Sequence, residues 1–262
     1  MTKERDKESS WSRSLRRVIK EKKLNINAIV PSTSGTHGGQ SPNLGEPPPP
    51  PPPGGPPRGG PRAGPTHTAQ KQRVRKSFTQ PTRCTSLNPR GKTVFLEEDP
   101  KWFQTVLKDS PYLKAYTVKY RTQLSQADHL LSSYRSERLC SSSDAYLRGN
   151  TRCRLALENL PDEVYETEWD LIMIDAPRGY FVEAPGRMGA IFSTTVMARN
   201  RKGSGVTHVF LHDVDRRVEK AFAEEFLCRK YLVKAVGRLW HFEIPSAANN
   251  ASVAGSNSVT FC

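Results

Sequence analysis

The pattern of apolar and polar residues predicts alternating strands and helices from about residue 92 onward. Its clearest element is the apolar run 171–174, which lies between Asp170 and Asp175 and is too short for a confident helix. Pro177 and Gly179 follow at once and end any periodic element. A short apolar run bounded in this way is typical of a buried parallel strand, whose carboxyl end is where open α/β sheets bind ligands.

The same patterns predict the other elements. Strands are expected at 92–96, 112–121 and 207–216, and a closing antiparallel pair at 239–244 and 258–262. Helices are expected at 102–107, 124–134, 153–160, 187–199 and 219–228. Strands that alternate with helices favour an α/β fold whose mostly parallel sheet is covered on both faces.

Composition divides the chain into two parts. Residues 1–83 hold 16 of the 40 Lys and Arg residues but only 5 of the 26 Asp and Glu residues, so they carry +11 of the net charge of +14. They also include seven consecutive prolines at 47–53, and such a segment buries too little apolar surface to fold. We therefore predict a disordered basic and Pro/Gly-rich tail over 1–83 and a folded domain over 84–262.

The basic clusters at 13–30 and 71–76 leave two interpretations open. They are either a solvated, partly helical tail or a patch for nuclear import, a membrane surface or an acidic partner. Neither is interleaved with the aromatic residues that a surface for single-stranded nucleic acid uses, so no specific nucleic-acid binding is predicted.

Neither a membrane span nor a signal peptide is visible in the sequence. No window approaches the roughly 20 consecutive apolar residues of a spanning helix, and the first residues lack an apolar core. The five cysteines form no Cys-x-x-Cys pair, which argues against a structural zinc site made of cysteines. Cys140 with Cys153, and Cys228 with Cys262, are either disulfides in an oxidising lumen or buried thiols, and the sequence leaves both open.

Three predicted strands carry chemistry at their carboxyl ends: Glu97 and Glu98 after the first, Asp175 after the next, and His212 with Asp213. Parallel strands bring these ends to one edge of the sheet, so the side chains are expected to share a cleft. Oxygen ligands with an imidazole suit a divalent cation, or a general base beside a cofactor. The rival interpretation is that each acid caps the helix that follows it.

Four long segments then resemble a known family. They are 93–102, 174–188, 209–220 and 237–242, which include Ile174-Asp-Ala-Pro-Arg-Gly-Tyr180 and Phe210-Leu-His-Asp213. They are similar to the plant polysaccharide-biosynthesis family that contains the glucuronoxylan 4-O-methyltransferases, and most similar to its irregular-xylem-fifteen-like branch. The resemblance implies a Rossmann-like methyltransferase fold, S-adenosylmethionine, a Golgi location and a role in xylan synthesis in secondary cell walls.

The resemblance also implies roles for individual residues. Glu97 or Glu98 would bind the ribose hydroxyls of the cofactor. Asp175 would face the transferred methyl group and the sugar hydroxyl. With Asp213, it matches the metal-binding acids of catechol-type O-methyltransferases, but Val214 stands where those enzymes have an amide ligand.

Arg178 and Arg187 would bind an acidic sugar, since a guanidinium group matches a carboxylate, although surface arginines are the simpler explanation.

One departure from the family pattern concerns the start of the domain. The family has a strand and a glycine loop where this chain has residues 79–85, so the first strand and part of the cofactor site are expected to be missing. The membrane anchor of the family is expected to be missing as well, as in a truncated form that stays cytosolic rather than in the Golgi. Two functions therefore stay open: a xylan methyltransferase, or a non-catalytic factor or inactive form that acts through xylan-synthesis proteins.

Overall fold

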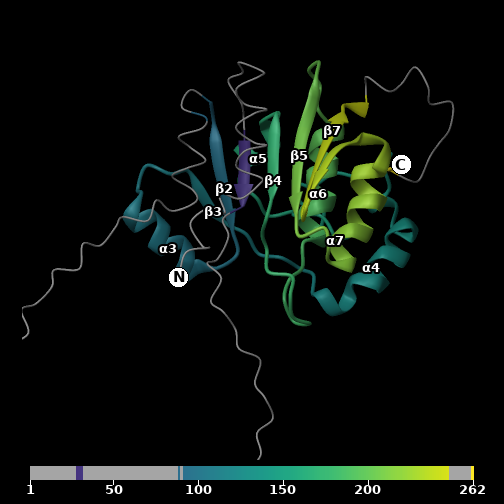
Figure 1. Ribbon diagram of the computed structural model, residues 1–262, viewed down its shortest axis with the longest axis horizontal. Coiled ribbons are helices and arrows are strands. Elements are labelled where there is room, and N and C mark those ends of the chain that lie inside the picture. The colour runs from purple at the N-terminus through teal and green to yellow at the C-terminus, as the bar shows by residue number, and fades with distance from the viewer. Residues whose placement is uncertain (1–27, 32–87, 89–90, 248–260) are drawn as a thin grey trace, which may run out of the picture. The chain divides into compact units, whose positions relative to one another are not determined.

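The computed structural model describes residues 28–31, 88, 91–247 and 261–262. They form an α/β structure around one seven-stranded sheet in the order β3-β2-β1-β4-β5-β7-β6 (Figure 1). The strands are β1 (Ala28–Pro31), β2 (Thr93–Glu97), β3 (Ala115–Thr117), β4 (Leu171–Ile174), β5 (Val206–His212), β6 (Leu232–Val236) and β7 (Leu239–Pro245). The pairs from β3 through β5 are parallel, and β7 is antiparallel to both β5 and β6. The prediction of a mostly parallel sheet is confirmed.

The expectation that the first strand is missing is wrong. Ala28–Pro31 forms β1 in the middle of the sheet, where Ala28 pairs with Thr93 of β2 and with Leu171 of β4. A run of four residues within a basic segment is too short for its pattern to stand out, and Pro31 at its end suggests a loop. The rest of the predicted tail lies outside the described residues, so the division at residue 83 stays a prediction.

The helices are α3 (Pro100–Asp109), α4 (Ala127–Ser133), α5 (Asp162–Glu166), α6 (Met188–Arg199) and α7 (Arg217–Phe222). A π-helical run, η4 (Ala223–Cys228), continues α7. Short 3-10 helices are η1 (Leu124–Gln126), η2 (Tyr134–Ser136), η3 (Arg138–Cys140) and η5 (Arg229–Tyr231). Within these described ranges, no helix has both the length and the apolar character needed to cross a membrane.

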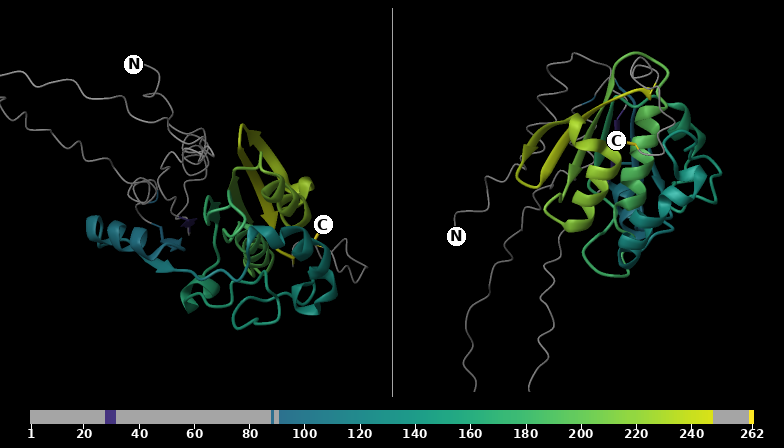
Figure 2. Two further views of the ribbon diagram at one scale, coloured as in Figure 1. Left: turned by 90° about the horizontal axis from the view of Figure 1, so that it is seen from below. Right: turned by 90° about the vertical axis from the view of Figure 1, so that its right-hand side faces the viewer.

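Local chemistry explains where the central elements begin. The Asp99 side chain accepts hydrogen bonds from the backbone N–H groups of Lys101 and Trp102, and Pro100 takes the first helical position of α3, so Asp99 caps this helix. Helix α6 is buried on nearly all sides and packs against β4, β5 and β7, beside α7 (Figure 2). Its Gly189 lies so close to the carbonyl of Leu155 that a Cβ atom would be 3.3 Å from that oxygen.

Two predicted elements are absent from the described residues. Residues 153–160 form turns instead of a helix, and the side chain of Arg121 donates to carbonyl groups within and just before this segment, those of Asn150, Thr151, Cys153 and Ala156. The antiparallel partner of β7 is β6 and not the predicted strand at 258–262. Of that predicted strand only Phe261 and Cys262 are described, and these two residues are not in a strand.

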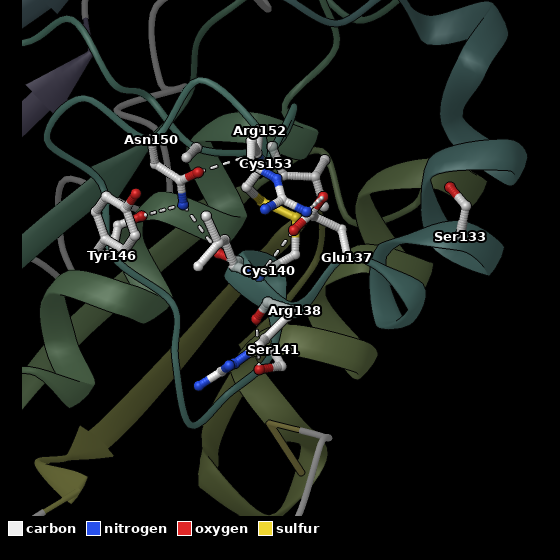
Figure 3. Close-up of a disulfide and its surroundings, with 12 residues drawn as sticks. Ser133, Glu137, Arg138, Cys140, Ser141, Tyr146, Asn150, Arg152 and Cys153 are labelled. Atoms are coloured by element: carbon white, nitrogen blue, oxygen red, sulfur yellow. Dashed lines mark hydrogen bonds and ion pairs between the residues drawn. A yellow bond between two sulfur atoms is a disulfide. The ribbon is translucent and has the colours of Figure 1, made fainter.

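Both cysteine pairs are disulfides. Cys140 and Cys153 have Cα atoms 5.3 Å apart, and Cys228 and Cys262 have Cα atoms 5.5 Å apart. Around the first bridge, the Asn150 side chain donates to two carbonyl groups and accepts from the N–H of Cys153 (Figure 3). The bridge and this amide together order a stretch that has little regular secondary structure. Of the two states that the sequence left open, the structure has the disulfides.

Candidate functional site

The candidate site lies where β4 and β5 end. These strands are parallel neighbours with Ile174 opposite Leu211, so the residues that follow, Asp175 and His212, lie side by side. His212 Nδ1 is 2.8 Å from Asp175 Oδ1 and 3.2 Å from Asp213 Oδ1. Both carboxylates are buried, whereas the side chain of His212 is 27% exposed. The prediction that these three residues meet at one edge of the sheet is confirmed.

Asp213 is surrounded by cations. Its carboxylate oxygens lie 2.6 Å from Arg238 Nη2, 2.8 Å from Arg187 Nη2 and 3.0 Å from Arg216 Nη2. Burial favours the neutral acid, yet Arg187, His212 and Arg216 outweigh it, so the pKa of Asp213 lies below its ordinary value. Asp213 has a φ of 61°, a left-handed conformation that turns the chain just after β5.

Arg187 holds the two strand ends together. Its guanidinium group donates to the carbonyl oxygens of Asp175 and His212, both at 2.7 Å, and to Asp213 Oδ2 at 2.8 Å. The residue is only 4% exposed. These contacts make Arg187 a positioning residue. Because they already engage its guanidinium group, they argue against direct binding of an acidic sugar by Arg187. The predicted sugar binding is not tested by the structure and stays a prediction.

The arginines also bear on the predicted divalent cation. Asp175, His212 and Asp213 offer three ligand atoms close together. However, both oxygens of Asp213 already contact guanidinium groups, and a divalent cation would add charge among three arginines. These residues therefore fit a metal ion poorly, and the chemistry proposed below uses none at this position.

The acids after β2 have separate roles. Glu97 is buried at the end of the strand, and its Oε1 accepts the N–H groups of Glu98 and Asp99, both at 2.9 Å. Glu98 Oε1 instead accepts the N–H and Nε of Arg178, both at 2.9 Å, and Asp99 lies 3.4 Å from the same guanidinium group. Glu98 and Arg178 thus join two strand ends that β1 separates in the sheet. Which of these two acids binds the ribose stays a prediction.

Glu219 was not predicted from the sequence, and it lies against Gly179 in the loop after β4. It is 1% exposed, and neither carboxylate oxygen accepts a hydrogen bond in the part of the chain that the structure describes. Burial raises its pKa above the ordinary value, and Arg216 Nη1 is 3.7 Å away. A Cβ atom on Gly179 would lie 2.7 Å from Glu219 Oε1, so this loop position accepts only glycine without a shift. In the sequence, Glu219 resembles an ordinary acid in the first turn of a helix.

The loop that connects Asp175 with Arg187 is anchored at its base and exposed at its tip. The N–H of Gly186 donates to the carbonyl of Arg178, and the N–H of Leu124 donates to the carbonyl of Ala184. Tyr180 is 67% exposed. The base of this loop is therefore fixed by hydrogen bonds, whereas its tip is accessible to solvent.

Asp175 and His212 thus pair at the carboxyl ends of adjacent parallel strands, the edge where open α/β sheets bind ligands. Residues 79–242, more than half of the chain, match the family described as IRX15/IRX15L/GXM. The chain belongs to this family. No solved structure gives a significant match.

The chain is similar in sequence to three named proteins from Arabidopsis thaliana. The chain is 70% identical to arabinogalactan O-methyltransferase 1 over 177 residues, 68% of this chain and 61% of that protein. It is 49% identical to glucuronoxylan 4-O-methyltransferase 1 over 161 residues, 62% of this chain and 56% of that protein. Identity to protein IRX15-LIKE is 36% over 170 residues, 64% of this chain and 53% of that protein.

The chain therefore spans about six tenths of the length of the first of these relatives. The family expected from the sequence is confirmed, but the irregular-xylem branch is not, since identity to IRX15-LIKE is half of that to the arabinogalactan enzyme.

Proposed function

We propose that this chain is an S-adenosylmethionine-dependent O-methyltransferase with a Rossmann-like fold that methylates a hydroxyl group of a plant cell-wall polysaccharide. The observation that carries the proposal is the buried Asp175 carboxylate 2.8 Å from His212, in a chain 70% identical to a named O-methyltransferase. The strand order, with β1 central and Glu97 at the end of β2, supports a cofactor at the same edge.

His212 is the proposed base. When its Nδ1 carries the proton and donates to Asp175, the lone pair of Nε2 is free to accept a proton from the sugar hydroxyl. Asp175 then orients the ring and stabilises the imidazolium that forms, while Arg187 fixes the backbone beneath both residues. S-adenosylmethionine, when bound, supplies an electrophilic methyl group. The sulfur–methyl bond of the cofactor would break to leave a neutral thioether as the hydroxyl oxygen takes up the methyl group, and the hydroxyl proton would pass to His212.

Arabinogalactan is the acceptor to test first, and glucuronoxylan second. The two relatives named as arabinogalactan O-methyltransferases are 70% and 64% identical to this chain, whereas those named as glucuronoxylan 4-O-methyltransferases are 47–50% identical. The same identities favour an enzyme over the alternative of a non-catalytic factor. Methyl transfer from labelled cofactor to each polysaccharide, with one protein preparation, would separate the two acceptors.

Asp175→Asn and His212→Gln test the mechanism. The amide of Asp175→Asn keeps the shape of the side chain but holds an imidazolium poorly, so turnover should fall by at least about 100-fold. If Asp175 acts only as a helix cap, the free energy of unfolding of Asp175→Asn should change by no more than about 1 kcal/mol. Asp128→Asn, an exposed acid paired with Arg217, is the matched control. Retained transfer in both site variants would reject this mechanism.

Binding of the cofactor should be measured separately by calorimetry. If the chain binds no S-adenosylmethionine at millimolar concentration, the enzyme proposal fails, and a non-catalytic role becomes the better one. The two disulfides support folding in an oxidising compartment such as the Golgi lumen. Alkylation of thiols in intact cells, followed by mass analysis, would reveal free thiols at the four paired cysteines if the protein is instead cytosolic.

A further inference from the structure

A second cluster of ligand-type side chains lies on β5 and β7, apart from the candidate site. The two strands are antiparallel, with His208 opposite Glu243 and Phe210 opposite His241. Paired residues in such a ladder point to the same face of the sheet, and positions two apart along a strand share that face. His208, His241 and Glu243 therefore come together although 33 residues separate the two histidines.

The distances within the cluster suit a metal ion. His208 Nδ1 is 3.0 Å from His241 Nε2 and 3.6 Å from Glu243 Oε1, and all three ligand atoms lie within 4.8 Å of one another. A tetrahedral zinc ion with bonds of about 2.0–2.2 Å places its ligand atoms roughly 3.3 Å apart. The two separations from His208 Nδ1 lie on either side of this value, so His208 needs only small movements relative to the other two ligands to close around an ion.

The surroundings orient the ligands. Both imidazole rings are buried, and the ring of Phe210 stacks on that of His241 with centroids 4.2 Å apart and planes 3° apart. The side chain of Glu243 is 37% exposed, which leaves a route for an ion and a water ligand. Among the described residues, no arginine or lysine forms an ion pair with Glu243, in contrast to the three arginines around Asp213.

We propose that His208 Nδ1, His241 Nε2 and Glu243 Oε1 bind a divalent cation, with zinc the best fit, and that the ion links β5 to β7. Two imidazoles and one carboxylate are ligands that Zn²⁺ prefers, and water completes the coordination. When the ion binds, it replaces the contact between His208 Nδ1 and His241 Nε2, and both of these nitrogen atoms become ligands. Because the link is structural, its contribution is to the stability of the sheet and does not depend on the proposed methyl transfer.

Titration of the full chain with zinc chloride after removal of metal by a chelator tests the proposal. One equivalent of Zn²⁺ should bind and raise the melting temperature. His241→Gln and Glu243→Gln should each weaken binding by at least about tenfold, since one of three protein ligands is lost. Glu243→Gln is the safer variant, because its partly exposed side chain leaves the fold intact.

Two control variants separate the possible outcomes. His129→Gln changes an exposed histidine that is far in sequence from the proposed ligands, and this variant should bind zinc as the unmodified protein does. His212→Gln should also retain binding; if it abolishes binding while His241→Gln does not, the metal lies at the other cluster and the proposal is overturned. Absence of binding at any micromolar zinc concentration would equally overturn it, and the two histidines would then be a hydrogen-bonded pair.

Discussion

Replacement of Arg187 by alanine should be among the most destabilising single changes at the candidate site. The guanidinium group is 4% exposed and satisfies the carbonyl oxygens of Asp175 and His212 as well as the carboxylate of Asp213. Removal of one member of a buried ion pair leaves the other charge uncompensated, which costs about 3–5 kcal/mol. In a domain of this size, we expect the melting temperature to fall by roughly 6–20 °C.

Chemical denaturation followed by circular dichroism measures this loss directly. Arg187→Lys should lose less, because the ammonium group keeps the charge but cannot reach three acceptors in the planar arrangement of the guanidinium group. Arg217→Ala, which breaks an exposed ion pair with Asp128, is the control and should leave the denaturation midpoint unchanged.

A loss below about 1 kcal/mol in Arg187→Ala would refute the reasoning. It would mean that Arg216 and Arg238 already neutralise Asp213 and that water satisfies the exposed carbonyl groups. A large loss in stability with normal cofactor binding would instead confirm a structural role for Arg187.

Three further predictions concern the surroundings of the site. The raised pKa of Glu219 means that the folded protein holds this proton more tightly than the unfolded chain, so stability is full below the unfolded pKa and falls as pH rises through the folded pKa. Glu219→Gln should therefore increase the free energy of unfolding at neutral pH but not in acid, and an equal effect at both pH values would contradict this. Gly179→Ala should destabilise by about 1 kcal/mol, because the atom in the way is the end of the Glu219 side chain, and a second change of Glu219→Ser should recover part of the loss in a double-mutant cycle. Cys140→Ser combined with Cys153→Ser should cost about 3 kcal/mol, from the loop that the bridge closes, and denaturation with and without reductant would detect it.

The sequence predicted the centre of the site because each of its residues follows an apolar strand. Asp175 and His212 occupy equivalent positions on adjacent parallel strands, so topology alone brings them together. The cations around Asp213 could not be predicted in this way. Arg216 and Arg238 reach it from the turn before α7 and from the hairpin between β6 and β7, and only the folded chain shows which acid they meet.

The failures have physical causes as well. Residues 153–160 have helical spacing, but carbonyl groups there are satisfied by the side chain of Arg121, and a disulfide fixes the start of the segment. The pair His208 and His241 gave no sequence signal, because antiparallel register, not spacing, places them together. Strand β1 was missed because four residues carry too little pattern.

The π-helical turn after α7 has a consequence for which length changes the chain tolerates. A π-turn holds one residue more than an α-helical turn, so removal of one residue within Ala223–Cys228 lets the turn close as α-helix and leaves the residues that follow nearly in place. An added residue has no such adjustment and rotates everything that follows by about 100° around the axis. Phe226, packed between Phe192 and Phe261, would then leave its aromatic neighbours, and Cys228 would point away from Cys262. Substitutions in this turn can be absorbed one side chain at a time, whereas the gain of one residue breaks the aromatic packing and the cross-link together.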